Sequence, residues 1–280
     1  ILDSLVLSKI RTATGGNLRG SLSGGGALPK HIDEFFNNIG IPVFEGYGLT
    51  ETSPTISVRT MEKLIIGTVG PLYANTEIRL MDINSGKQIY PGNNGFGVKG
   101  EIHVKGPQVM KGYYKNKEAT DKVLKDSWFN TGDLGVMTFN HCLKIVGRSK
   151  ETIVLLSGEN VEPTPIENKL LQSEYIDQCM VLGQDRKFLT AFIVPKLDKF
   201  KQSGSSMETI SEDKETQKII REEIKKLIST ENGFKSFEKI QDFRLLPKPF
   251  GIGDELTAKL SVKRHVVTEK YTKLFESMYI

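Results

Sequence analysis

Four short stretches of the sequence contain residue types that can bind a phosphorylated ligand. The first is Gly46-Tyr47-Gly48-Leu49-Thr50-Glu51-Thr52, which directly follows a predicted strand. Its glycines let a ligand approach the backbone closely, and Tyr47 offers a flat face for stacking. Thr50 offers a hydroxyl to a phosphate, and Glu51 offers a hard oxygen ligand to Mg²⁺. An ordinary β-turn gives the same pattern, so this stretch alone is weak evidence.

The next two stretches lie at predicted turns. Ser23-Gly24-Gly25-Gly26-Ala27-Leu28-Pro29 places three glycines between a strand and a helix, where free backbone groups can meet a ligand; a flexible loop is the alternative. Trp128-Phe129-Asn130-Thr131-Gly132-Asp133-Leu134-Gly135 places Asp133 where it could accept hydrogen bonds from both hydroxyls of a ribose. The alternative for Asp133 is a carboxylate that caps its own turn.

The fourth stretch lies where a β-rich region gives way to an α+β region. It reads Gly147-Arg148-Ser149-Lys150-Glu151-Thr152-Ile153, and Gly158-Glu159-Asn160-Val161-Glu162-Pro163 follows it closely. Basic residues at a domain boundary can follow a nucleotide that touches both sides. A linker with solvated charges is the alternative.

The first part of the chain, residues 1–63, is predicted to be a partial parallel α/β layer. Apolar spacing indicates a helix over 2–14 that Gly15-Gly16 ends. A strand over 18–23, a helix from Pro29 to near Gly40 and a strand over 42–45 complete the layer.

Residues 64–149 are predicted to be a small antiparallel β subdomain, because helical periodicity disappears and short alternating stretches follow one another. The expected strands, turns and helix are strands 76–82, 100–105 and 143–146, hairpin turns 82–86 and 91–95, and a helix over 116–125.

Residues 150–280 are predicted to be a small α+β domain, which makes the whole chain an α/β and α+β multidomain protein. The expected elements are strands 152–156, 177–182, 190–195 and 243–246, helices 164–173, 216–230 and 265–277, and a polar loop over 201–217.

Composition limits the class of protein. The chain has 280 residues, of which 38% are hydrophobic and 26% charged, with a formal net charge of +4; these values suit a globular protein and give no reason to expect nucleic-acid binding. Cys142 and Cys179 have no disulfide or zinc spacing and are expected to be buried in a reducing compartment. Because no apolar run is long enough to span a membrane, we expect a cytoplasmic protein, with peripheral membrane contact left open. The start at Ile1-Leu2-Asp3 suggests a fragment.

In this order, the four stretches resemble the adenylate-forming superfamily of acyl-CoA synthetases, adenylation domains and luciferases, over essentially the whole chain. The segment from Gly253 through Arg264 to Tyr279 is similar to long-chain fatty acid–CoA ligases, especially their bubblegum-type branch. The resemblance implies that a fatty acid carboxylate attacks the α-phosphate of ATP, and that the thiol of CoA then displaces AMP. It also implies a mobile C-terminal domain over 150–280.

The resemblance assigns roles to individual residues. Tyr47 and Gly48 would lie at the adenine, with Gly24, Gly25 and Gly26 lining the adenine and acyl pocket. Thr50 would touch the phosphate and Glu51 would hold Mg²⁺. Asp133 would bind the ribose beside Arg148. Lys150 would be the hinge, and the loop at Gly158 would help to form the pantetheine tunnel.

Two features depart from the family pattern. The upstream phosphate-binding loop is absent from the 280 residues, so this fragment alone is expected to be inactive and to need a missing N-terminal half. Where the family has a lysine that bridges the substrate carboxylate and the α-phosphate, this chain has Ser261. Loss of one such electrostatic group costs about 3–4 kcal/mol of transition-state stabilisation. Lys259 and Lys263 would lie on the same face as Ser261 in an extended segment and are candidate substitutes.

These departures leave other functions open. A non-enzymatic alternative is a relative that binds AMP or acyl-AMP with impaired adenylation, since Ser261 cannot supply a positive charge. A third reading is adenylation of a different carboxylate, as in peptide-synthesis modules.

Overall fold

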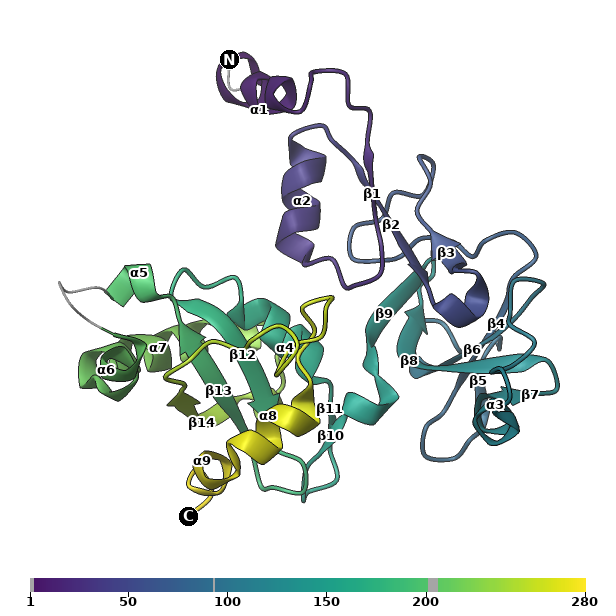
Figure 1. Ribbon diagram of the computed structural model, residues 1–280. Coiled ribbons are helices and arrows are strands. Elements are labelled where there is room, and N and C mark those ends of the chain that lie inside the picture. Colours follow the sequence, from purple (N-terminus) through teal and green to yellow (C-terminus); the bar gives the residue numbers. More distant parts are fainter. Residues whose placement is uncertain (1–2, 93, 201–205) are drawn as a thin grey trace. The chain divides into compact units, whose positions relative to one another are not determined.

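A strand, a glycine-rich loop, a helix and a second strand form the first sheet layer of the fold, as the sequence predicts (Figure 1). β1 (Ser21–Ser23) pairs in parallel with β2 (Val43–Gly48), and α2 (Lys30–Asn38) connects them. β3 (Thr55–Val58) extends this sheet antiparallel to β2. Pro29 lies just before α2, where its missing N–H costs no helical hydrogen bond. The predicted parallel α/β layer is therefore confirmed.

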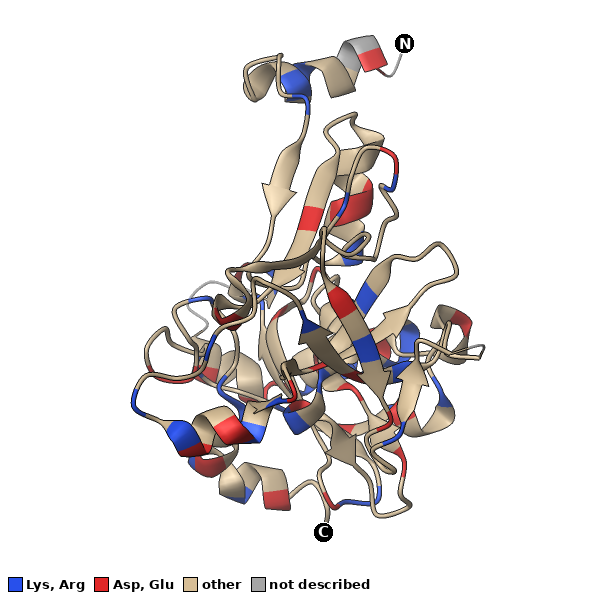
Figure 2. Ribbon diagram, turned by 90° about the vertical axis from the view of Figure 1, so that its right-hand side faces the viewer, with Lys and Arg blue, Asp and Glu red and all other residues tan. Residues whose placement is uncertain are grey.

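The computed structural model describes residues 3–92, 94–200 and 206–280. The chain divides into two compact units, Ile1–Lys150 and Glu151–Ile280, here called unit 1 and unit 2. Unit 1 begins with a π-helical turn (Asp3–Leu7) and α1 (Ser8–Ala13), and Gly15 and Gly16 follow with positive φ angles. Basic and acidic residues are interspersed along the ribbon of both units (Figure 2).

A six-stranded antiparallel sheet makes up most of the rest of unit 1. Its strand order is β5-β4-β6-β8-β7, and β9 pairs with β8. The bounds are β4 (Glu77–Met81), β5 (Gln88–Tyr90), β6 (Lys99–Lys105), β7 (Leu124–Lys125), β8 (Trp128–Met137) and β9 (Leu143–Arg148). α3 (Lys117–Val123) precedes β7, and the Asn116 side chain caps it by accepting a bond from the Ala119 N–H at 3.0 Å. The predicted antiparallel β region and its short helix are both present.

One face of this sheet is apolar and the other is polar. Ile78, Leu80, Ile102 and Val104 alternate into a buried cluster that also contains Ile56 of β3. The residues between them, such as Arg79 and His103, point to the opposite face and are only half-buried. The alternation explains why helical periodicity was missing from this part of the sequence.

The two predicted turns in this region have different outcomes. Asp82 begins a hairpin turn between β4 and β5, and its Oδ1 accepts bonds from the N–H groups of Asn84 and Ser85. The second prediction, a hairpin turn over 91–95, is wrong for the residues that are described, since β5 pairs with β4, and β6 pairs with the other edge of β4. Asn93 lies outside the described residues.

Unit 2 is built around a mixed three-stranded sheet that is buried on both faces. β12 (Ile176–Leu182) is antiparallel to β13 (Leu189–Pro195), and β14 (Ile240–Leu245) is parallel to β13. Cys179 and Val181 face one apolar cluster with α4 (Pro163–Leu170) and α7 (Lys214–Leu227). Met180 and Leu182 face a second cluster with α8 (Arg264–Lys270) and α9 (Thr272–Glu276).

The remaining elements of unit 2 are short. They are β10 (Ile153–Val154), β11 (Asn160–Val161), α5 (Leu197–Phe200), α6 (Met207–Glu212) and two 3₁₀ turns (Thr230–Asn232 and Ser236–Glu238). α6 corrects the predicted loop over 201–217: the side chain of Ser206 caps α6 and that of Asp213 caps α7. Residues 201–205 lie outside the described residues. The predicted single helix over 265–277 is two helices, α8 and α9.

Both cysteines are free thiols, and both are buried, as expected. Burial raises the pKa of the Cys179 thiol well above its ordinary value. Among the described residues, the helices are too short or too polar to cross a bilayer.

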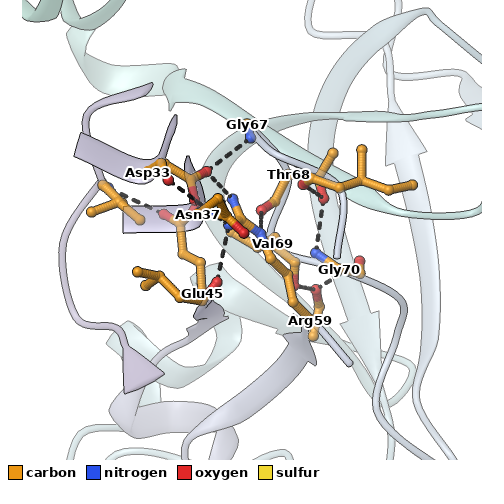
Figure 3. Close-up of polar contacts among 12 residues, drawn as sticks. Asp33, Asn37, Glu45, Arg59, Gly67, Thr68, Val69 and Gly70 are labelled. Carbon is orange, nitrogen blue, oxygen red and sulfur yellow. Dashed lines mark hydrogen bonds and ion pairs between the residues drawn. The ribbon is translucent and has the colours of Figure 1, made fainter. Parts of the chain in front are cut away.

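A fully buried guanidinium joins the parallel layer of unit 1 together (Figure 3). The Nη1 and Nη2 atoms of Arg59 donate to the two carboxylate oxygens of Asp33 on α2, both at 2.8 Å. Nη2 also donates to Glu45 Oε2 at 2.9 Å on β2, while Nε donates to the Thr68 carbonyl at 2.6 Å. The Val43 carbonyl accepts a further bond at 3.2 Å. Five hydrogen bonds therefore satisfy the five N–H donors of a side chain that is fully shielded from solvent.

Replacing Arg59 with Met is expected to destabilise unit 1 by about 3–5 kcal/mol, because it leaves Asp33 and Glu45 buried without a cation. Trp128 is the sole tryptophan of the chain and lies in unit 1, so its fluorescence during urea unfolding reports on this unit. The matched control is Lys30→Met, whose exposed partner is Glu34, and its unfolding midpoint should stay close to that of the wild type. Equal midpoints for both variants would contradict the prediction.

Candidate functional site

Three of the predicted site residues meet in unit 1. The Tyr47 hydroxyl, on β2, donates to Asp133 Oδ2 on β8 at 2.7 Å. Asp133 lies opposite Arg148 in the β8–β9 ladder, and Arg148 Nε is 3.3 Å from Asp133 Oδ1. These residues are separated by up to 101 positions along the chain (148 − 47), and the strand pairing brings them together.

Burial sets the electrostatics of this cluster. The Asp133 side chain is 10% exposed, whereas that of Arg148 is 64% exposed. Burial raises the pKa of Asp133, an effect that the Tyr47 hydroxyl and Arg148 oppose. Burial and the neighbouring Asp133 charge raise the pKa of Tyr47 well above its ordinary value, so Tyr47 stays a hydrogen-bond donor. An ionised carboxylate has about four lone-pair directions, so Asp133 can still accept bonds from a ligand's hydroxyl groups.

The glycine-rich loop lies beside the start of this cluster. Ser23 pairs with Glu45, so Gly24 follows next to Gly46, and a Cβ atom on Gly24 would lie 3.4 Å from the Gly46 carbonyl. Gly25 has a φ of +81°, which favours glycine. The Leu28 N–H donates to Glu45 Oε1 at 3.1 Å. Glu45 therefore holds the end of the loop with one oxygen and Arg59 with the other.

Glu45 and Arg59 were not among the predicted site residues. The available signal was the alternation in β2, which buries Val43 and Glu45 on the same face. A carboxylate at an inward strand position needs a buried partner, but the sequence does not say which cation supplies it.

The chain after β2 makes a close turn that explains Gly48. A Cβ atom on Gly48 would lie 1.6 Å from the Pro54 carbonyl oxygen, so only glycine fits. Thr50 and Glu51 lie in a 3₁₀ turn (Thr50–Thr52), with Thr50 exposed. The Tyr113 hydroxyl donates to Glu51 Oε1 at 2.9 Å, a contact that the sequence did not predict.

Glu51 has the donor chemistry for Mg²⁺ but is a single carboxylate. Groups of three or more metal-ligating side chains are absent from the described part of the chain. Mg²⁺ is usually bound through one or two carboxylates, and it keeps several waters and takes its other ligands from phosphate oxygens.

Two further predicted residues, Lys150 and Gly158, lie close in the sequence to the point where unit 1 ends and unit 2 begins. Lys150 is exposed in a 3₁₀ turn (Ser149–Glu151). Gly158 lies in the loop of the β10–β11 hairpin with a φ of +91°, and its N–H donates to the Leu155 carbonyl at 2.9 Å. Gly158 is exposed, and a Cβ atom there would meet no atom of the described chain within 4 Å.

The segment around Ser261 is a turn, and the prediction of an extended strand with one shared face is wrong. The Leu260 N–H donates to the Thr257 carbonyl, the Thr257 N–H donates to the Ser261 carbonyl, and Leu260 has a φ of +63°. Lys259 and Ser261 are exposed on this turn. Lys263 is half-buried, and its Nζ donates to the Gly253 carbonyl at 2.9 Å. The two lysines therefore differ in how freely their charges can move.

Comparison with protein families gives a match to each part of the chain. Residues 2–114 match a family described as AMP-binding enzyme. Residues 150–280 match a family described as AMP-binding enzyme C-terminal domain.

Curated relatives align with the whole chain. A probable chloroplastic acyl-activating enzyme 16 of Arabidopsis thaliana is 38% identical, over 100% of this chain and 40% of the relative. A long-chain-fatty-acid–[acyl-carrier-protein] ligase, AEE15, from the same plant is 37% identical, over 100% and 38%. The long-chain-fatty-acid–CoA ligase FadD15 of Mycobacterium bovis is 34% identical, over 100% and 45%. The chain thus spans less than half the length of these relatives.

Solved structures share the fold. The adenylation and carrier didomain of a carboxylic acid reductase from Segniliparus rugosus, in complex with AMP, has a TM-score of 0.77 at 23% identity, over 99% of this chain and 37% of that one. The ATP-bound RpMatB-BxBclM chimera B1 has a TM-score of 0.73 at 25% identity, over 98% and 50%. These likenesses support the predicted multidomain α/β and α+β architecture.

The position of Glu45 leads to a pH-dependent prediction. Burial raises the pKa of Glu45 in the folded chain above its ordinary value, so the folded state binds this proton more tightly than the unfolded state. The contribution of Glu45 to the free energy of unfolding should therefore increase as the pH falls through the folded pKa towards the ordinary value. In Glu45→Gln this contribution is absent. The difference in unfolding free energy, wild type minus variant, should grow as the pH falls through the folded pKa towards the ordinary value of 4.5. Urea unfolding followed by Trp128 fluorescence measures it, and a constant or shrinking difference would refute the assignment.

Proposed function

Since this chain belongs to the AMP-binding, adenylate-forming enzyme family, we propose that it is part of an acid–thiol ligase that acts on long-chain fatty acids. A fatty acid carboxylate oxygen forms a bond to the α-phosphorus of ATP, and the bond to the pyrophosphate oxygen breaks. The CoA sulfur then attacks the acyl carbon of the acyl-adenylate, and AMP leaves while the thiol proton passes to solvent. The names of two relatives, at 37% and 34% identity, support this substrate class.

The observation that carries the proposal is the Tyr47–Asp133–Arg148 cluster. Asp133 is a buried acceptor whose position two hydrogen-bonding neighbours fix, which suits the two hydroxyls of a ribose. Tyr47 would lie at the adenine, and the Gly24, Gly25 and Gly26 loop would line the base and the acyl group. Positioning of this kind is the main means by which such a site would accelerate the reaction.

We assign the phosphate end of the site to Thr50 and Glu51. Glu51 would hold Mg²⁺, which supplies charge neutralisation when it is bound, and Tyr113 would orient the carboxylate through its hydrogen bond. A glycine-rich triphosphate loop is expected in a segment upstream of residue 1, which would also supply much of the acyl tunnel.

Residues 150–280, which include all of unit 2, are proposed to be the mobile domain of the enzyme, with 1–63 and 64–149 as two subdomains of the large domain. Lys150 would be the hinge between the large domain and the mobile domain. Gly158, exposed in its hairpin loop, would approach the pantetheine of CoA in the second half-reaction. We propose a cytoplasmic location, and the narrower bubblegum-type assignment stays a prediction.

Lys259 is our candidate for the charge that Ser261 cannot supply. It is exposed on the turn two residues before Ser261, whereas the Lys263 ammonium already donates to the Gly253 carbonyl. A charged group that meets the carboxylate and the α-phosphate together would relieve charge repulsion as the new bond forms.

Asp133→Asn tests the ribose assignment. Loss of the charged acceptor should weaken AMP binding by about ten- to a hundredfold, since a hydrogen bond to a charged group is worth about 1.5–3 kcal/mol. The melting temperature should not fall, because burial already disfavours the charged carboxylate. Calorimetric titration of the 280-residue chain with AMP measures the affinity, and Asp126→Asn, on an exposed turn, is the control. Unchanged affinity in Asp133→Asn would remove Asp133 from the site.

Exchange of pyrophosphate into ATP tests the first half-reaction. A protein that joins this chain to its upstream half should show palmitate-dependent exchange, and Lys259→Gln should slow it by about a hundredfold or more. Adding Ser261→Lys to the Lys259→Gln variant should restore exchange. If only Ser261→Lys shows exchange, the native protein is an AMP- or acyl-AMP-binding relative without adenylation. Thioester formation with CoA, compared with a phosphopantetheinyl acyl carrier protein, identifies the acceptor.

A further inference from the structure

The polar face of the six-stranded sheet carries a small cavity that the proposed reaction does not use. Arg79 on β4 lies opposite His103 on β6, and His103 lies opposite Asn130 on β8, so the three side chains form one row across the sheet. Lys125 on β7 lies opposite Trp128 at the start of β8. Together with Lys122 on α3, these residues line a cavity of about 90 Å³.

The charged side chains that line the cavity are basic. Arg79, Lys122 and Lys125 line it, and the described lining includes no carboxylate. The guanidinium carbon of Arg79 is 4.5 Å from the centre of the Trp128 ring, which fixes the orientation of the guanidinium. Lys105 also approaches the same ring, at 5.9 Å.

Arg79 has an unsatisfied donor. Its Nε atom is buried and has no acceptor in the described chain, while its Nη2 atom is 3.3 Å from His103 Nδ1. An unpaired buried N–H on a charged group is costly, and an anion would remove that cost only if neighbouring side chains moved to expose Nε. Arg79 is therefore not fully satisfied by the described chain, and the part of its side chain that lines the cavity is the part that an anion could meet.

The acidic residues nearby are already engaged. Glu101 Oε2 accepts from Asn130 Nδ2 at 2.8 Å and is 3.4 Å from His103 Nε2. Glu77 pairs with Lys105 at 3.5 Å. Glu118 pairs with Lys122 at 2.7 Å, but both side chains are largely exposed, so this pair is screened and the lysine can turn to a ligand.

The size and charge of the cavity select the ligand. A cavity of about 90 Å³ has room for more than one water-sized group, and therefore for a small tetrahedral oxyanion. Arginine binds phosphate oxygens through paired N–H groups, and the two lysines add charge. We propose that this cavity binds the dianionic phosphate monoester group of a ligand, independently of the nucleotide site around Tyr47 and Asp133.

The single tryptophan provides the readout. Inorganic phosphate and methyl phosphate, added to the 280-residue chain at constant ionic strength, should each change the Trp128 fluorescence with saturation. Dimethyl phosphate, a diester monoanion, should bind at least about tenfold more weakly. A linear response to all three salts, or equal affinity for the diester, would overturn the proposal.

Matched variants locate the binding. Lys122→Gln combined with Lys125→Gln should weaken phosphate binding about tenfold or more, because both charges line the cavity. Lys117→Gln, on the same helix, removes an equivalent exposed pair with Asp121 and lies outside the cavity, so its affinity should stay within about twofold. If the double lysine variant and Lys117→Gln lost the same phosphate affinity, the anion would have to bind outside this cavity.

The same titration identifies the source of the phosphate group. CoA carries a 3′ phosphate monoester that dephospho-CoA lacks. If CoA binds more tightly than dephospho-CoA, and the advantage disappears in the double lysine variant, the site takes the thiol substrate of the proposed reaction. If CoA has no advantage while inorganic phosphate still binds, the ligand is another phosphorylated metabolite. Because no turnover is measured, failure of the ligase proposal leaves this test unaffected.

Discussion

The buried charge network of Arg59 is the constraint on which unit 1 depends. A guanidinium removed from water is tolerated only where its donors are satisfied and its charge is paired, and Arg59 meets Asp33, Glu45 and two backbone carbonyls. Because these partners come from α2, β2 and the loop after β3, the three segments have one arrangement relative to each other. The network fixes orientation more than it adds stability, since burying ions is itself costly.

This constraint reaches the candidate nucleotide site through Glu45. One oxygen of Glu45 belongs to the Arg59 network, and the other holds the Leu28 N–H at the end of the glycine-rich loop. Two residues further along β2, Tyr47 fixes the Asp133 carboxylate. A single strand therefore connects a buried ionic anchor to a ligand-binding surface. The exposed glycines of the loop let a ligand reach that surface, and the buried Arg59 network holds the surface in a fixed position.

The six-stranded sheet of unit 1 and the three-stranded sheet of unit 2 differ in how many of their faces are buried. In unit 1 the six-stranded sheet buries one face and leaves the other polar, and that polar face gathers Arg79, Lys125 and Trp128 around a small cavity. In unit 2 the three-stranded sheet is covered on both faces, so β12 and β13 consist almost entirely of buried residues. Only the first arrangement leaves strand residues free to bind a ligand.

The sequence by itself determined the class of fold and supplied candidate residues for the site. Strand periodicity and Pro29 before a helix are local signals, so the parallel layer and the β region could be predicted. The roles of Tyr47 and Asp133 stay predictions from the family resemblance, and the structure adds that the two side chains contact each other. It did not determine that β5 pairs away from β6, or that Lys259 and Ser261 lie on a turn, because register and turn geometry depend on hydrogen bonds to distant or non-adjacent residues. Only the tertiary structure decided that Arg59 pairs with Asp33 and Glu45, that Tyr113 meets Glu51, and that the Nε atom of Arg79 has no acceptor in the described part of the chain. The sequence shows that a buried charged side chain must have a partner. Which residue is that partner depends on which strands and helices pack together.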